Sequence, residues 1–276
     1  TFEAGFAAGR SQAVHCTIPA DLDTPVSLML KLTQARRDSF MLESVTGGDT
    51  RGRYSFIGFK PDLIWRCRGD RAEINRSARW DSDAFEHDPR PVLESLRAAL
   101  EESRIELPRG LPPGMAGLFG YLGYDMVRHV ERLPEPNADP LGLPDAVMMR
   151  PTIVAAVDSV KDEVTFVTPV RAGTGETARA AYARAAERLS DAVMDLDRAP
   201  SEARADGDPA PAPEQVSNTS FERYVEVVRK AKEYILSGDI FQVVPSQRWT
   251  VDFPAPPFAL YRALRRTNPS PYMFYF

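Results

Sequence analysis

Cysteine and histidine are scarce in this sequence. Its 276 residues include two cysteines and three histidines, which are too few for a disulfide framework and show none of the spacings typical of zinc sites. It also lacks an apolar run long enough to span a bilayer and the pattern of a secretory signal. We therefore expect a cytoplasmic protein with no membrane partner.

Positive charge is not concentrated anywhere. The chain carries 34 Lys and Arg against 39 Asp and Glu, a formal net charge of −5. Basic pairs such as Arg36-Arg37 and Arg265-Arg266 are short, whereas phosphate binding needs a concentrated basic face. This pattern argues against nucleic acid as a main partner, and the content of 43% hydrophobic and 26% charged residues is that of an ordinary globular protein.

The length allows one large domain or one and a half. The chain begins with Thr1, and it stops inside the aromatic run 272–276. An end in such a run would leave an exposed strand edge that favours association. We therefore expect a fragment whose fold is incomplete at the carboxyl end.

Local patterns predict helices that alternate with antiparallel hairpins. Thr24 with Pro25 at the first turn is typical of a helix start, and glycines at every third position from 114 to 123 indicate a tight turn or closely packed strand backbone. Further helices are predicted over 89–103 and 175–196, strands over 39–44 and 54–58, and hairpins joining 63–68 to 71–75 and 152–157 to 163–168.

The composition changes at residues 197–216. Ala, Pro, Asp and Glu predominate there, so the segment cannot bury a core and is predicted to be a flexible linker. It divides the chain into a domain at 1–196 and a second, truncated domain at 217–276.

The second domain begins with a strong helix pattern. Thr219 and Glu222 predict a capping box, and Gly238 is the expected left-handed stop. The following run 240–244 is typical of a buried strand. Gln242 lies within it, and because a buried amide must be hydrogen-bonded, its partner is either neighbouring backbone or a ligand.

Several short motifs follow one another along the chain. They are MLES at 41–44, GRYSFIG at 52–58, GLFGYLGYD at 117–125, SGDIFQVV at 237–244 and NPSPYMFY at 268–275. In this order they closely resemble the component I (large subunit) family of anthranilate synthase, among the chorismate-utilising enzymes. The resemblance covers nearly the whole chain, which corresponds to about the first half of that family.

The resemblance implies a fold and a division of labour. The fold is α+β, an antiparallel β-sandwich with helices packed outside, which agrees with the hairpins found above. Residues 1–196 would form a regulatory domain that binds L-tryptophan, and residues 217–276 would begin the chorismate-binding catalytic domain.

The matching tryptophan-binding positions are Glu43, Ser44, Pro271, Tyr272 and Met273. Glu43-Ser44 would meet the polar end of an amino acid, and the proline-fixed Tyr-Met run would provide an apolar slot for the indole. The residues alone favour a structural interpretation instead, with Ser44 as a turn residue at a strand end and Met273 as an ordinary core residue.

The implied reaction converts chorismate and ammonia to anthranilate and pyruvate, the first step of tryptophan biosynthesis, and L-tryptophan inhibits it. This lyase takes ammonia from a glutamine amidotransferase subunit and uses Mg²⁺ as a Lewis acid on the chorismate carboxylate. The family's catalytic and metal-binding motifs lie beyond Phe276, so no metal ligand is predicted here. Related isochorismate synthases have a lysine where this chain has Gln242, and an amide cannot act as a base; Gln242 is therefore a candidate for positioning the nucleophile.

Two alternatives stay open. Aminodeoxychorismate synthase component I has the same fold and substrate, although DIFQVV at 239–244 and PSPYM at 269–273 favour anthranilate synthase. The isolated chain could instead be a non-catalytic module that binds an amino acid, because the active-site half of the family is not matched.

Overall fold

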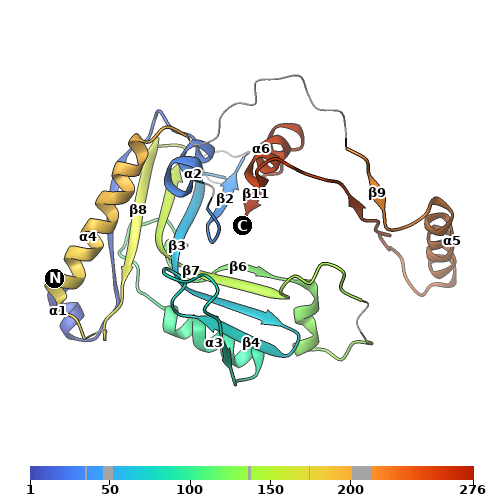
Figure 1. The fold of residues 1–276 in the computed structure, drawn as a ribbon, viewed down its shortest axis with the longest axis horizontal. Coiled ribbons are helices and arrows are strands. Elements are labelled where there is room, and N and C mark those ends of the chain that lie inside the picture. Colours follow the sequence, from blue (N-terminus) through green and yellow to red (C-terminus); the bar gives the residue numbers. More distant parts are fainter. Residues whose placement is uncertain (35, 46–51, 136–137, 174, 201–212) are drawn as a thin grey trace. The chain divides into compact units, whose positions relative to one another are not determined.

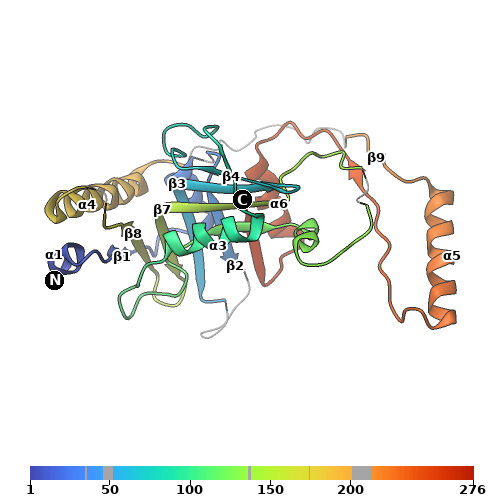
Figure 2. The same cartoon turned by 90° about the horizontal axis from the view of Figure 1, so that it is seen from below.

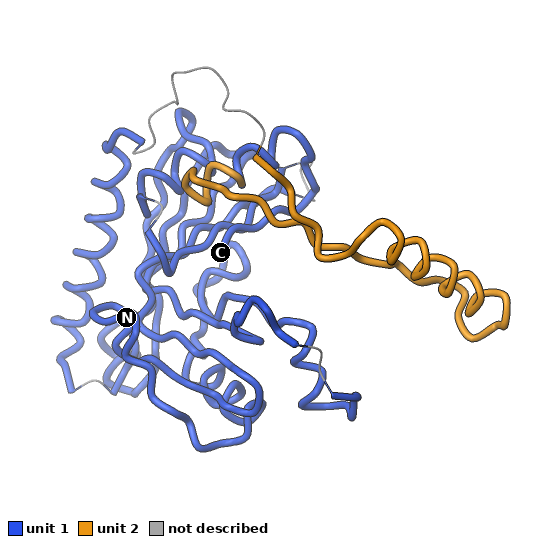
Figure 3. Tube along the Cα trace, turned by 45° about the vertical axis from the view of Figure 1, so that its right-hand side comes forward, with its two compact units in different colours: residues 1–203, 261–276 blue, residues 204–260 orange. Residues whose placement is uncertain are grey.

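The structure is a computed structural model that describes residues 1–34, 36–45, 52–135, 138–173, 175–200 and 213–276. Its contacts divide the chain into two units (Figure 3). The larger unit comprises Thr1–Ala203 together with Tyr261–Phe276, and the smaller one comprises Arg204–Leu260.

A nine-stranded sheet forms the core of the larger unit (Figure 1). The main path runs β1-β8-β7-β3-β2-β11, while β4 pairs with β3 and β5, and β6 pairs with β7. Every pairing is antiparallel. The strands are β1 (Gln12–Pro19), β2 (Phe40–Ser44), β3 (Tyr54–Arg68), β4 (Arg71–Asn75), β5 (Glu86–Asp88), β6 (Phe119–Leu122), β7 (Ala146–Asp158), β8 (Glu163–Val170) and β11 (Tyr272–Tyr275).

Helices cover this sheet from outside (Figures 1 and 2). The alanine face of α4 packs with Phe6 and Val170, and α3 buries Val92 and Ala99 against Trp65. The helices within its first segment, up to Ala203, are α1 (Phe2–Ala7), α2 (Pro25–Thr33), α3 (Val92–Ser103), α4 (Ala178–Met194) and the short 3₁₀ helices η1 (Tyr124–His129) and η2 (Asp195–Asp197). The expected α+β class, with antiparallel strands and outer helices, is confirmed.

A chain of buried polar contacts fixes α3 to the sheet. The indole Nε1 of Trp65 donates to Ser95 Oγ at 2.9 Å, and that hydroxyl donates to Asp88 Oδ2 at 2.7 Å. Hydrogen bonds from Arg90, together with the one from Ser95, hold the pKa of Asp88 well below its usual range. The indole N–H of Trp65 and the hydroxyl of Ser95 therefore each have an acceptor, as burial requires.

The structure corrects the prediction of two strands around Pro61. Residues 54–58 and 63–68 belong to one strand, β3, which pairs with β7 on both sides of a register shift between Pro61 and Leu63. Lys60, at φ 53°, turns the backbone just before this bulge. A bulge tolerates a proline, which has no N–H to donate, so the proline bends the strand without ending it.

Of the two alternatives predicted for the glycine-rich segment, a tight turn or closely packed strand backbone, the close packing is found. A Cβ added at Gly120 in β6 would lie 1.8 Å from the carbonyl oxygen of Val147 in β7, and one at Gly123 would lie 2.8 Å from that of Asp145. The two backbones approach so closely that only glycine fits between them.

The helix starts were predicted with unequal success. Thr24 caps α2 as expected, its hydroxyl accepting from the Ser27 N–H at 3.1 Å. In the smaller unit α5 (Phe221–Ser237) is capped by Ser220, whose hydroxyl accepts from the Arg223 N–H at 3.2 Å. The prediction of Thr219 as the cap is wrong by one residue, because its hydroxyl bonds to Asn218 instead.

The strand predicted over 240–244 is absent. No strand of the described residues pairs with this run, and Phe241 is 96% exposed. An apolar segment needs a neighbouring strand or helix to bury it, and none of the described elements supplies one. The smaller unit instead pairs β9 (Val216–Ser217) with β10 (Trp249–Thr250), and the left-handed stop at Gly238, with φ 82°, is confirmed.

Between β10 and β11, α6 (Pro257–Thr267) belongs to the larger unit from Tyr261 onward. Most of the predicted linker 197–216 lies outside the described residues, and the functional division at residue 217 stays a prediction. None of the helices in the described ranges combines the length and the apolar character needed to cross a membrane.

Candidate functional site

A cavity of about 600 Å³ lies against β2, β3 and β11 in the larger unit. Four of the predicted tryptophan-binding residues border it, and Pro271 does not. Its lining consists of Leu42, Glu43, Ser44, Gly52, Arg53, Tyr54, Phe56, Tyr272, Met273 and Phe274.

Ser44 and Tyr272 come together as a cross-strand pair that borders this cavity. They lie opposite each other in the antiparallel register of β2 and β11, so their side chains share a face of the sheet. The Ser44 hydroxyl is half-buried and makes no hydrogen bond with any residue that the structure describes. None of the described residues therefore competes with a ligand for this hydroxyl.

An apolar row continues the same face. Leu42 stands opposite Phe274 in β11 and opposite Phe56 in β3, and alternation along β2 puts Leu42 on the face of Ser44. We did not predict Leu42, Phe56 or Phe274 as site residues. Alternation along each strand puts Leu42 on the face of Ser44 and Phe274 on the face of Tyr272, but the register of the strands was needed to bring these residues and Phe56 together.

Glu43 occupies the opposite face of β2. Its side chain is fully buried, and its carboxylate accepts from the Tyr261 hydroxyl at 2.6 Å and from Arg265 Nε at 2.8 Å. Burial first, and then the hydrogen bond to Glu43, raises the pKa of Tyr261, while the bond to Glu43 raises that of Arg265. The carboxylate thus ties β2 to α6 and does not face the Ser44 side of the sheet.

The remaining predicted residues have backbone or opposite-face positions. Met273 is the register partner of Glu43, so its thioether lies on the same side as that carboxylate. The Pro271 carbonyl accepts from the Val45 N–H at 3.2 Å and extends the pairing of β11 with β2. The structure therefore brings the side chains of Ser44 and Tyr272 together on one face of the sheet. The side chains of Glu43 and Met273 lie on the opposite face.

Arg53 forms another wall of the cavity, with its charge compensated. Its Nε donates to Asp158 Oδ1 at 2.8 Å and its terminal nitrogen to Oδ2 at 2.5 Å. These bonds hold the pKa of Asp158 below its usual range. The guanidinium also lies over the Tyr54 ring, 5.0 Å from its centroid, so Arg53 orders the aromatic wall.

Gln242 lies in the smaller unit and is exposed in the unpaired run 240–244. Its expected role in positioning a nucleophile stays a prediction.

In the part of the chain that the structure describes, no three His, Cys, Asp or Glu side chains come together as metal ligands, so these residues do not by themselves fit the predicted Mg²⁺.

Comparison with known proteins places these residues in a family context. A family model described as chorismate binding enzyme matches residues 38–276. Anthranilate synthase component 1 of Cereibacter sphaeroides is 62% identical over 276 residues, which are 100% of this chain and 55% of that protein. The Pseudomonas putida protein of the same name is 38% identical over 271 residues, covering 95% of this chain and 52% of its own length.

A solved structure agrees with the fold. The crystal structure of anthranilate synthase component I from Streptococcus pneumoniae TIGR4 aligns with a TM-score of 0.61 at 22% identity, covering 82% of this chain and 49% of that one. The chain thus spans about half the length of the curated relatives it matches.

Proposed function

Since this chain belongs to the family of chorismate binding enzymes, we propose that it works as part of an anthranilate synthase component I. That enzyme would convert chorismate and ammonia to anthranilate and pyruvate, in the first step of tryptophan biosynthesis. The support is the identity of 62% to a protein of that name, extending over all 276 residues.

We further propose that the cavity beside Ser44 binds L-tryptophan as a feedback inhibitor. The observation that carries this proposal is the register pair of Ser44 and Tyr272, which places a hydroxyl that bonds to none of the described residues next to an apolar row. The hydroxyl and the strand edge would hold the amino and carboxylate groups. The indole would lie on Leu42, Phe56 and Phe274, and a cavity of about 600 Å³ is ample for a ligand of this size.

Glu43 connects the strand that borders this site to helix α6. It lies between Leu42 and Ser44, yet its carboxylate holds Tyr261 and Arg265 of α6. A ligand that shifts the pairing of β2 with β11 would therefore also shift α6. Such a displacement is the kind of coupling through which an inhibitor acts at a distance.

The whole protein would need further components. We propose a glutamine amidotransferase subunit as the source of ammonia, Mg²⁺ as the metal, with no ligand assigned to it in this chain, and the cytoplasm as the location. Gln242 would position the nucleophile once the run 240–244 is covered.

An assay of the full-length protein tests this function. With chorismate, ammonium and Mg²⁺ we expect the fluorescence of anthranilate to appear, and L-tryptophan to suppress it. Ser44→Ala should raise the tryptophan concentration for half-inhibition at least tenfold, because a lost hydrogen bond to a charged group is worth about 1.5–3 kcal/mol. Each variant is compared with its own uninhibited rate.

Ser82→Ala is the control, since Ser82 lies outside the cavity and bonds only to exposed Asp83 among the described residues. It should leave inhibition unchanged. Aminodeoxychorismate as the product would replace the proposed reaction by its nearest alternative, and equal effects of the two serine variants would remove the tryptophan site from the cavity.

A further inference from the structure

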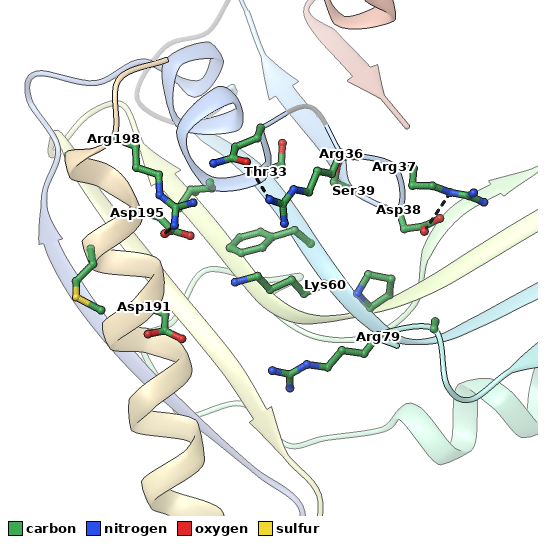
Figure 4. Close-up of a pocket in the computed structure, with 16 residues that line it drawn as sticks. Thr33, Arg36, Arg37, Asp38, Ser39, Lys60, Arg79, Asp191, Asp195 and Arg198 are labelled. Carbon is green, nitrogen blue, oxygen red and sulfur yellow. Dashed lines mark hydrogen bonds and ion pairs between the residues drawn. The ribbon is translucent and has the colours of Figure 1, made fainter. Parts of the chain in front are cut away.

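A second cleft, of about 620 Å³, lies in the larger unit and shares no lining residue with the cavity beside Ser44 (Figure 4). It is walled by the end of α2 and the turn after it, by the bend of β3 at 59–61, by Ala78 and Arg79 after β4, and by the end of α4 with η2. Neither the family motifs nor the proposed function uses it.

Basic side chains dominate this cleft. Its lining includes Arg36, Arg37, Lys60, Arg79 and Arg198 against Asp38, Asp191 and Asp195. Arg37 is 3.6 Å from Asp38, and Arg198 is 2.8 Å from Asp195. Lys60 and Arg79 form no ion pair with any described residue. The guanidinium of Arg36 donates a hydrogen bond to the neutral amide of Gln34. Positive charge is thus left in excess.

Helix ends explain only part of this charge. Arg36 follows the carboxyl end of α2 and Arg198 that of α4 and η2, where cations offset the helix dipole. Lys60 lies at a strand bend and Arg79 in a connection, so neither has a helix end to neutralise. Both side chains are exposed, and Figure 4 shows them along the same wall of the cleft.

The positive charge of Arg79 is also felt nearby. Burial lowers the pKa of Arg188, and the charges of Arg79 and Arg184 lower it further. The charges of Asp62 and Glu176 act on it in the opposite direction.

Unusual backbone conformations gather in the same lining. Four non-glycine residues in the described ranges have a positive φ, and three of them border this cleft: Gln34 at 52°, Asp38 at 61° and Lys60 at 53°. Gln34 is accounted for as the left-handed cap of α2. Lys60 is accounted for by the bulge of β3 that follows it. Asp38 has no such explanation, and residues held in this region concentrate at ligand-binding sites.

The floor beneath the cations is apolar. Leu32 is 3% exposed, Phe59 is 2% exposed and Ala78 is 8% exposed. A ligand that fits such a cleft has an apolar body and a negatively charged group at one side, and the volume is in the range of small-molecule sites.

We propose that this cleft binds a small aromatic or alicyclic carboxylate, with its carboxylate on Lys60 and Arg79 and its ring on Leu32, Phe59 and Ala78. The planar guanidinium of Arg79 suits the two oxygens of a carboxylate, and Lys60 adds a point charge. This site is independent of the proposed tryptophan cavity.

Calorimetric titration of the chain with benzoate and with phthalate tests the proposal. We expect one saturable site, weakened by added NaCl because the cations are exposed. The double variant Lys60→Gln/Arg79→Gln should raise the Kd at least tenfold. The matched control Arg97→Gln/Lys161→Gln removes the same charge from exposed positions outside the cleft and should leave the Kd within about twofold.

Three outcomes overturn the proposal: no saturable heat up to about 5 mM benzoate or phthalate, equal weakening in both double variants, or inorganic phosphate binding as tightly as benzoate, which would remove the role of the apolar floor. Thermal melting checks that the variants fold. Arg79→Gln alone, at a connection rather than a strand bend, supplies the test if the Lys60 substitution disturbs β3.

Discussion

Gly120→Ala is expected to lower the free energy of unfolding by about 3 kcal/mol or more, the range of severe packing defects. The added methyl would stand 1.8 Å from the Val147 carbonyl oxygen and 2.8 Å from the carbon of the same group. Both are backbone atoms of β7, a strand held by neighbours along its whole length. Since they cannot turn aside as a side chain could, the pairing of β6 with β7 has to open.

Gly114→Ala is the control for this prediction. Its new methyl would meet nothing within 4 Å, so the only expected cost is that of its left-handed backbone at φ 79°, about 1–2 kcal/mol. Chemical denaturation measures both variants. Equal losses of stability would show that the close approach of β6 to β7 is not the constraint described here.

Glu43→Ala is expected to cost about 3 kcal/mol, because it leaves Arg265 and the Tyr261 hydroxyl without their shared acceptor in a buried place. The carboxylate is fully buried and Arg265 is 33% exposed, so water can compensate only part of the loss. The loss should appear in the free energy of unfolding of the larger unit.

Two further variants separate this pair from an ordinary ion pair. Glu73→Ala removes a carboxylate that is likewise paired with an arginine, Arg66 at 2.7 Å, but is 22% exposed, and should cost about 1 kcal/mol or less. Glu43→Ala/Arg265→Met should be more stable than Glu43→Ala alone, since it removes the unpaired charge. A double variant less stable than Glu43→Ala would contradict the role of Glu43 and Arg265 as a buried ion pair between β2 and α6.

Local chemistry was enough to predict most of the sheet. The hairpin of β3 and β4 follows from the Gly69-Asp70 turn, and α2 follows from Thr24 and Pro25. Near Pro61 the sequence predicts a strand end where the structure has only a bend, because the sequence does not show that β7 pairs with β3 on both sides of it. The prediction of a buried strand over 240–244 was wrong for a related reason, since burial of a strand depends on partners that its own residues do not specify.

The candidate site was predicted less completely. Ser44 and Tyr272 were found through family resemblance, because no local rule pairs strands so far apart in the chain. The same resemblance grouped Glu43 with Ser44, whereas alternation along β2 puts their side chains on opposite faces. The partners of Glu43 on α6 gave no signal at all, as a buried ion pair between distant segments leaves no spacing to detect.

The central claim, an amino-acid site formed by β2, β3 and β11, is tested most directly by calorimetric titration of this chain with L-tryptophan and L-phenylalanine. We expect one molecule of tryptophan to bind per chain, more tightly than phenylalanine, and Phe274→Ala to weaken it about fivefold because stacking on an aromatic side chain is worth about 1 kcal/mol. Phe253→Ala, which removes another exposed ring outside the cavity, should bind tryptophan as the parent chain does. Equal affinity for the two amino acids, or no saturable heat with either, would contradict the account.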